Sequence, residues 1–180
     1  AVDSLTAEAS PATLWPAQWA DKKMPIRARQ TRLKYRVLVS DVDGTMLDSR
    51  GSMPRAVSAA IEHYLSCGGQ LILATGKLYA SIKSLVEAIG LSTPQIVCDG
   101  AAIAQPVSDS IHPRAVLDTA LAHDVSRLLQ RIHIEHVFYT STSILAMRGA
   151  VSDVHLCDLL KLGEPRPLFL QNDTLFDENP

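Results

Sequence analysis

The amino-acid sequence predicts an α/β protein built on a parallel sheet. Short apolar runs at 37–40, 71–74 and 96–98 have the length and composition of buried strands. The first two runs are each followed by a segment whose apolar residues recur at helical spacing. Strands that alternate with amphipathic helices form right-handed βαβ units, and such units produce a parallel sheet.

The two helices between these strands have recognisable ends. The first is expected to begin at Pro54, because proline suits the first position of a helix, and to end at Gly68 and Gly69. The second is expected over 78–89, since Gly90 follows its last apolar residue.

A different pattern begins after about residue 105, where two strands follow one another. The predicted elements are, in chain order, a helix at 116–132, strands at 136–140 and 144–148, and a helix at 152–162. Gly163 ends the last helix, and the residues after it are expected to be irregular. Consecutive strands do not belong to a βαβ series, so this part of the chain is expected to be a separate unit.

The chain therefore divides into an N-terminal extension at 1–35, a first α/β unit at 36–113 and a second unit at 114–180. The extension joins a stretch rich in Ala, Ser, Thr and Pro to a basic stretch, which is typical of a poorly ordered arm. Trp15 and Trp19 lie four residues apart and suit one face of a short helix. The alternative to a poorly ordered arm is an arm that binds an anionic partner or directs the chain to an organelle.

Composition narrows the class of protein. The 180 residues are 47% apolar and 20% charged, as in ordinary globular domains, and the net charge of −2 gives no reason to expect nucleic acid or membrane as a partner. Cys67, Cys98 and Cys157 are too widely spaced for a zinc knuckle and odd in number for a disulfide framework. No apolar run approaches bilayer length and no secretory signal pattern begins the chain, so the cytoplasm is the expected location.

Two carboxylates at the end of the first strand indicate phosphoryl chemistry. Asp41 and Asp43 are two residues apart, so on an extended backbone they share a face, and Gly44 lets the chain leave the strand. Adjacent ionised acids require a cation between them or an electrophile in front of them, and a phosphoryl group bound to Mg²⁺ satisfies both. Thr75 and Asp99 follow the next two strands, at the sheet edge where ligands of such folds bind.

The pattern Asp41-x-Asp43-Gly-Thr45-x-x-Asp48, followed by Leu73-Ala-Thr75-Gly76-Lys77, resembles the haloacid dehalogenase (HAD) superfamily of phosphohydrolases, and most closely its Cof-like branch. The resemblance runs from about residue 35 to 148. It implies a Rossmann-type parallel sheet with an inserted α/β cap, both incomplete in this chain. Asp99 stands where Cof-like proteins usually have Asn.

The resemblance also implies roles for individual residues. Asp41 would be the nucleophile and a Mg²⁺ ligand, and Asp43 would be the acid and base, with its backbone carbonyl on the metal. The substrate contacts would come from Thr45, Thr75, Gly76 and Lys77, although the branch normally has Arg at the last of these positions. The implied activity is Mg²⁺-dependent hydrolysis of a small phosphorylated metabolite, such as a sugar phosphate, through an aspartyl-phosphate. Asp48 is expected to be a turn residue.

Two family motifs are missing. Lys161 lies within a predicted helix and does not suit the third motif, and Leu168-Phe169 stand where the fourth motif needs Gly-Asp before Asn172-Asp173. The chain is therefore expected to end inside the cap. The strand that carries Asp41 would then be an exposed apolar edge through which the protein could associate.

The sequence leaves two alternatives to this activity and excludes a third. A non-catalytic fragment that keeps the phosphate-binding geometry, and a sugar phosphomutase, both remain open. A zinc deaminase based on His133-x-Glu135 is excluded, because no Pro-Cys-x-x-Cys follows.

Overall fold

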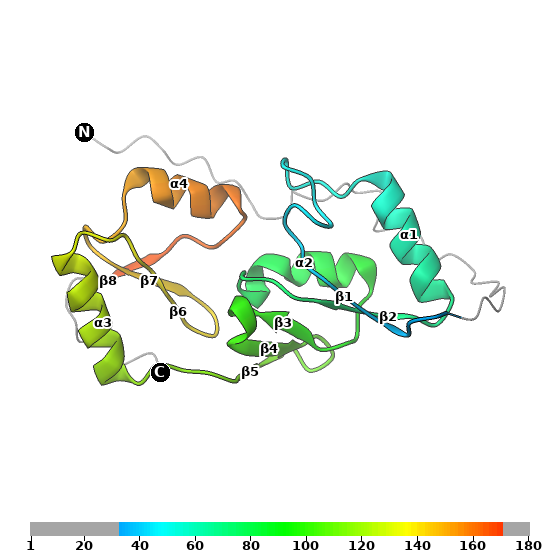
Figure 1. The fold of residues 1–180 in the computed structure, drawn as a ribbon, viewed down its shortest axis with the longest axis horizontal. Coiled ribbons are helices and arrows are strands. Elements are labelled where there is room, and N and C mark those ends of the chain that lie inside the picture. Colours follow the sequence, from blue (N-terminus) through cyan, green and yellow to red (C-terminus); the bar gives the residue numbers. More distant parts are fainter. Residues whose placement is uncertain (1–32, 171–180) are drawn as a thin grey trace.

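The computed structural model describes residues 33–170, which form two α/β units that lie side by side (Figure 1). The expectations for Trp15, Trp19 and most of the N-terminal extension lie outside these residues. Between residues 33 and 170, no helix combines the length and the apolar character that crossing a membrane would need.

The first unit confirms the expected βαβ connection. Strand β1 (Val37–Ser40) pairs in parallel with β2 (Gln70–Leu73), and helix α1 (Arg55–Ser66) connects them. Helix α2 (Tyr79–Ile89) leads on to β3 (Gln95–Val97). A parallel bridge joins Ala74, the residue after β2, to Ile96 in the middle of β3, so the three strands run in the same direction.

The chain after β3 forms an antiparallel meander that the sequence does not predict. A short 3₁₀ turn, η3 (Cys98–Gly100), is followed by β4 (Ala102–Gln105) and β5 (Ser110–Pro113), in the order β3-β4-β5. Its inward side chains include the small Ala102 and Ala104, which give little hydrophobic signal. The turn between β4 and β5 places Asp109 at a φ of 48°, where a glycine would have marked the turn more clearly.

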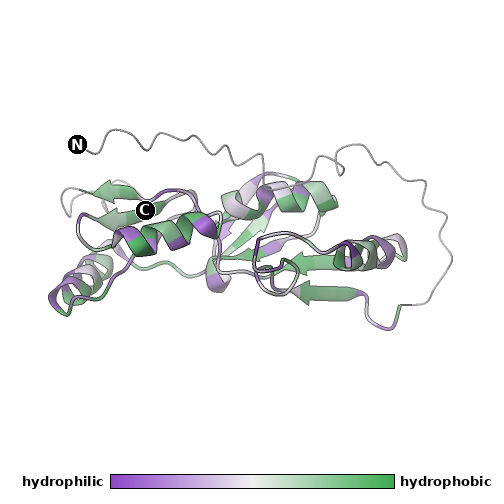
Figure 2. Ribbon diagram, turned by 90° about the horizontal axis from the view of Figure 1, so that it is seen from above, coloured by the Kyte–Doolittle hydropathy of each residue, from purple (hydrophilic) through white to green (hydrophobic). Residues whose placement is uncertain are grey.

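One hydrophobic core holds the first unit together. The apolar faces of α1 and α2 pack with the sheet, and Figure 2 shows the helices with both green and purple surfaces while the strands are mainly green. The buried Gln95 side chain accepts a hydrogen bond from the Leu73 N–H at 2.6 Å and donates one to the Thr93 carbonyl at 2.6 Å. This amide therefore ties the end of β2 to the segment that enters β3.

The strand β1 departs from the prediction of a buried strand. Val37, Leu38 and Val39 are 47%, 44% and 53% exposed. Within the described residues β1 pairs with β2 alone, so its other edge is free. The expectation of a buried strand is wrong for β1, and the expectation of an exposed apolar edge is confirmed.

The second unit surrounds another, smaller sheet. Helix α3 (Thr119–Arg131) is capped by Asp118, and the hairpin of β6 (Phe138–Tyr139) and β7 (Ile144–Met147) follows it. Helix α4 (Asp153–Lys161) then leads to β8 (Leu168–Leu170), which pairs in parallel with β7. The residues after Gly163 are thus not all irregular, because the Leu-Phe-Leu of β8 completes the sheet beside β7.

The histidine segment before β6 has a structural role in this unit. His136 is buried, and its ring lies within hydrogen-bonding distance of the Ser126 hydroxyl (3.1 Å) and the Ile134 carbonyl (2.9 Å). The ring also packs edge-on against Phe138, with the ring centroids 5.7 Å apart. The predicted strand at 136–140 is shortened to β6, and the His136 N–H ahead of it donates to the Ala150 carbonyl at 3.1 Å, beyond the end of β7.

We expect the free edge of β1 to promote association between copies of the chain, because unpaired backbone groups beside apolar side chains favour strand pairing. The variant Val39→Lys should shift sedimentation equilibrium toward the monomer. Its free energy of unfolding should change by less than about 0.5 kcal/mol, since the side chain is exposed.

The matched control for this experiment is Val107→Lys, which places the same charge on an exposed valine away from the edge. A wild-type chain that is monomeric at every concentration, or a Val107 variant with the same effect, would contradict the expectation.

Candidate active site

The carboxyl ends of three strands border one cavity of about 320 Å³. The chain leaves β1 at Asp41, β2 at Ala74 and β3 at η3, and each of these exits contributes to the wall. The lining residues are Asp41, Ala74, Thr75, Gly76, Ile96, Asp99 and Gly100. The structure therefore brings together the polar residues that the sequence places at the ends of separate strands.

Asp41 is held by the loop that follows it. Met46 and Leu47 both donate backbone hydrogen bonds to the Val42 carbonyl, at 3.0 and 2.9 Å, and all three of these side chains are buried. Gly44 takes a φ of 73° and so permits the tight turn. The Asp41 Oδ2 atom accepts a hydrogen bond from the Thr45 hydroxyl at 3.2 Å, which orients the exposed carboxylate.

Asp43 belongs to the same loop but does not line the cavity. Its Oδ1 atom accepts a hydrogen bond from the Lys77 Nζ at 2.8 Å. The Lys77 side chain is 12% exposed and the Asp43 side chain 36%, so this ion pair is partly shielded from water. The contact joins the loop after β1 to the loop after β2, and it assigns Lys77 a partner that the sequence does not reveal.

The segment Thr75-Gly76-Lys77 is fixed by its backbone. The Thr75 N–H donates to the Ile96 carbonyl at 3.0 Å, and the Thr75 hydroxyl accepts from the Lys77 N–H at 3.2 Å. A Cβ atom on Gly76 would lie 2.8 Å from the Asp99 Oδ1, which is closer than real Cβ contacts. Glycine is therefore required here by the close approach of a carboxylate.

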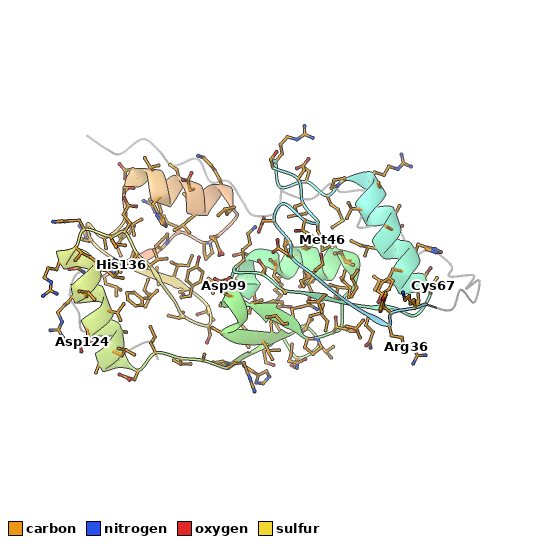
Figure 3. All side chains as sticks on the ribbon, in the orientation of Figure 1. Arg36, Met46, Cys67, Asp99, Asp124 and His136 are labelled. Atoms are coloured by element: carbon orange, nitrogen blue, oxygen red, sulfur yellow. The ribbon has the colours of Figure 1, made fainter. Side chains whose placement is uncertain are left out.

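Asp99 reaches this position through an unusual backbone. Cys98 and Asp99 have φ values of 51° and 52°, in the left-handed region that aspartate tolerates better than most residues. The Cys98 N–H donates to the Lys77 carbonyl at 3.0 Å, and the Asp99 N–H donates to the Thr75 carbonyl at 3.2 Å. Figure 3 shows Asp99 on the side of the first unit that faces the second. The sequence locates this residue at the sheet edge, but no role follows from its pattern.

A buried carboxylate from the second unit meets the loop after β2, and sequence reasoning misses it. Glu164 is 5% exposed and accepts hydrogen bonds from the Leu78 N–H at 3.3 Å and the Ser81 hydroxyl at 2.6 Å. Burial raises the pKa of Glu164, while the Ser81 and Leu78 hydrogen bonds and the Lys77 charge act in the opposite direction. A single glutamate more than eighty residues from its partners carries no local signal.

Two further groups beside this carboxylate are neutral near pH 7. Burial raises the pKa of the Tyr139 hydroxyl to about 12, with smaller contributions from the charges of Glu164 and Asp99. Burial likewise raises the pKa of the Cys98 thiol to about 11. Neither group therefore offers a reactive anion at the site.

Two other predicted positions lie away from the chemistry. Asp48 accepts hydrogen bonds from the Arg50 and Ser52 backbone N–H groups, at 2.9 and 3.0 Å, which confirms its expected role in the turn. These hydrogen bonds also hold the pKa of Asp48 below its usual value. Lys161 forms an exposed ion pair with Asp158 on α4 at 3.1 Å.

The donor chemistry of the site fits a magnesium ion in part. Mg²⁺ is commonly bound by one or two carboxylates together with water and substrate phosphate, and Asp41 and Asp43 supply oxygen donors of this kind. Between residues 33 and 170, no three His, Cys, Asp or Glu side chains converge as a metal-binding group. The described residues thus offer a partial ligand set.

We expect Gly76→Ala to destabilise the protein by about 1–3 kcal/mol, because the new methyl group overlaps the Asp99 carboxylate. The cost should fall when Asp99→Ala is present as well, since the clash is then removed. Chemical denaturation of the wild type, both single variants and the double variant measures this coupling. If the changes in the free energy of unfolding of the two single variants simply add in the double variant, the close contact with Asp99 is not the reason why glycine is needed at position 76.

Comparisons with known proteins identify the family of the chain. A family model described as haloacid dehalogenase-like hydrolase matches residues 38–161. Pyridoxal phosphate phosphatase YbhA of Escherichia coli (strain K12) is 24% identical over 110 residues, which are 61% of this chain and 40% of that protein.

Solved structures show the same fold. A haloacid dehalogenase-like hydrolase from Bacteroides thetaiotaomicron has a TM-score of 0.66 and 17% identity over 79% of this chain and 54% of that one. A sugar phosphatase of HAD subclass IIB has a TM-score of 0.65 and 16% identity, again over 79% of this chain and 54% of that one. The chain therefore spans about half the length of these structures and 40% of the curated relative. With more than half of its residues matched by the family model, the chain belongs to the haloacid dehalogenase-like hydrolases.

Proposed function

We propose that this chain carries the nucleophile and the phosphate-binding loop of a Mg²⁺-dependent phosphatase that acts on a small phosphomonoester. The observation that carries the proposal is that Asp41 and the Thr75-Gly76 segment line one cavity. A carboxylate nucleophile and donors that can hold phosphoryl oxygens are the two elements that an in-line displacement requires. The candidate donors are the Thr75 hydroxyl and the Gly76 N–H, because the Thr75 and Lys77 N–H groups are bonded within the protein.

The reaction would proceed in two displacements. In the first, an oxygen of Asp41 forms a bond to phosphorus while the bond from phosphorus to the alkoxide breaks, and the alkoxide takes a proton. In the second, water attacks the aspartyl-phosphate and releases phosphate together with the free carboxylate. The Thr45 hydroxyl, bonded to Asp41 Oδ2, would hold the carboxylate in the orientation for attack.

Asp43 and Lys77 would act as a pair. Asp43 is the candidate for moving the proton to the alkoxide and from the water. Lys77, bonded to Asp43 at 2.8 Å, places an ammonium group beside carboxylates that would otherwise repel a phosphate dianion. Lys77 therefore supplies part of the positive charge that phosphoryl transfer needs, although it lacks the two-pronged grip of arginine.

A magnesium ion would be held by the Asp41 carboxylate and the Asp43 backbone carbonyl, where it would neutralise charge on the phosphoryl group. The substrate proposed is a small phosphorylated metabolite. Support comes from the names of the relatives, one a pyridoxal phosphate phosphatase and one a sugar phosphatase, both of which describe small phosphomonoesters. We also propose a cytoplasmic location, where such metabolites are found.

The second candidate function is phosphate binding without hydrolysis of the ester. It is favoured by the partial metal ligand set within the described residues. Loss of a single transition-state stabiliser costs roughly 10²–10³ in rate, so loss of several would abolish measurable catalysis.

The test is phosphate release from p-nitrophenyl phosphate with Mg²⁺, measured for the wild type and for Asp41→Asn. We expect Asp41→Asn to lower kcat by about 10³-fold or more, because the amide cannot attack phosphorus. Acid quenching should trap a phosphorylated chain in the wild type only.

Asp124→Asn is the matched control, since Asp124 is an exposed aspartate on α3 that pairs with Arg127. Equal rates for the wild type and Asp41→Asn would refute the catalytic proposal. A wild type that binds inorganic phosphate in calorimetry but releases none from the ester would support the second function.

A further inference from the structure

A buried carboxylate of the second unit contacts the start of α2 in the first. After α4 the chain reverses at Gly163, which has a φ of 78°, and the Glu164 N–H donates back to the Leu159 carbonyl at 3.0 Å. This turn fixes the backbone of Glu164 at the end of α4. Its side chain crosses to Leu78 and Ser81 of the first unit.

The contact supplies what α2 lacks. Leu78 is the residue before the helix, and it has no side-chain oxygen with which to cap the free N–H groups of the first turn. Glu164 accepts from the Leu78 N–H, which is one of the free donors at this helix end, and from the Ser81 hydroxyl, so part of the capping of α2 comes from the other unit. A negative charge at a helix N-terminus is also favoured by the helix dipole.

The surroundings make this contact specific. A buried carboxylate is costly unless donors satisfy it, and Glu164 has two hydrogen-bond donors and the nearby charge of Lys77. The charge of Asp43 acts against that of Lys77 and raises the pKa of Glu164. The Tyr139 hydroxyl and the Cys98 thiol lie close enough to Glu164 for its charge to raise their pKa values. If the two units separated, the carboxylate would regain water but α2 would lose its cap.

The helix start that Glu164 holds is continuous with the candidate site. Leu78 directly follows Lys77, whose backbone N–H is bonded to Thr75 and whose Nζ is bonded to Asp43. Movement of the first turn of α2 would therefore displace both the phosphate-binding segment and the ammonium group. The Lys77 ammonium group lies near Glu164 of the second unit as well as Asp43 of the first, so its charge acts on both carboxylates.

We propose that Glu164 is a positioning residue that docks the second unit onto the first turn of α2 and thereby fixes the Thr75–Lys77 loop of the candidate site. The inference goes beyond phosphatase activity, because the docking holds whether or not the ester is turned over.

The direct test is hydrogen exchange at the Leu78 amide, measured by NMR on the full chain. In Glu164→Ala this amide should exchange at least about 10-fold faster than in the wild type, because its acceptor is gone. Glu164→Gln keeps an acceptor oxygen but loses the charge, so it should give a smaller increase. Glu87→Ala is the matched control, an exposed glutamate near the opposite end of α2 that should leave the Leu78 amide unchanged.

A second readout follows the separation of the units. Dyes on Cys67, at the end of α1, and on Cys157, on α4, report the distance between them by energy transfer. Figure 3 shows Cys67 at the far end of the first unit from the second. Cys98→Ser removes the third thiol, so that Cys67 and Cys157 are the two sites that carry dyes. Glu164→Ala should broaden the distance distribution and lengthen its mean.

Unchanged Leu78 exchange together with an unchanged distance distribution in Glu164→Ala would overturn the proposal. Should that variant fail to fold by circular dichroism, Ser81→Ala decides, since it removes one donor to Glu164 and should still speed Leu78 exchange. With an active wild type, Glu164→Ala should raise KM more than it lowers kcat. A wild type without phosphatase activity would refute the catalytic proposal alone, because exchange and distance still decide the role of Glu164.

Discussion

The parallel pairing of β1 with β2 is the constraint on which the candidate site depends. The register sets Ser40 opposite Leu73, and the Ala74 N–H donates to the Ser40 carbonyl at 2.8 Å, so Asp41 and Thr75 emerge beside one another. The bridge from Ala74 to Ile96 extends the same alignment to the third strand and to Asp99. A slip of one residue in this pairing would turn the alternate side chains to the opposite face and separate these groups.

The alignment concentrates negative charge, and this shapes what the site can bind. Asp41 and Asp99 line the cavity, Asp43 lies on the loop that follows Asp41, and Glu164 approaches from the second unit. Against these carboxylates the structure sets Lys77, which is already bonded to Asp43. A phosphate dianion would meet net repulsion in such surroundings unless a further cation entered with it. The charges of the described residues therefore support the role that we propose for Mg²⁺.

The parts of the fold that the sequence predicts are those with local signals. The helices α1 and α2 and the strand ends that carry Asp41 and Thr75 follow from apolar periodicity and from glycines at the breaks. The meander of β4 and β5 escapes prediction because its inward residues are small and its turn uses Asp109. Glu164 escapes because its partners are distant in sequence, and only the packing of the two units brings them together.

The position of Asp41 depends little on the exposed edge of β1, although Asp41 directly follows that strand. The apolar edge consists of Val37, Leu38 and Val39, which are exposed and, among residues 33–170, have a strand partner on one side only. Asp41, in contrast, is followed by the buried Val42, whose carbonyl closes the loop. The candidate nucleophile is therefore anchored from the loop side by the core of the first unit. The loop contacts that orient Asp41 do not involve the free edge of β1. A partner that covered this edge would therefore bury the side chains of the strand and leave the orientation of the Asp41 carboxylate largely unchanged.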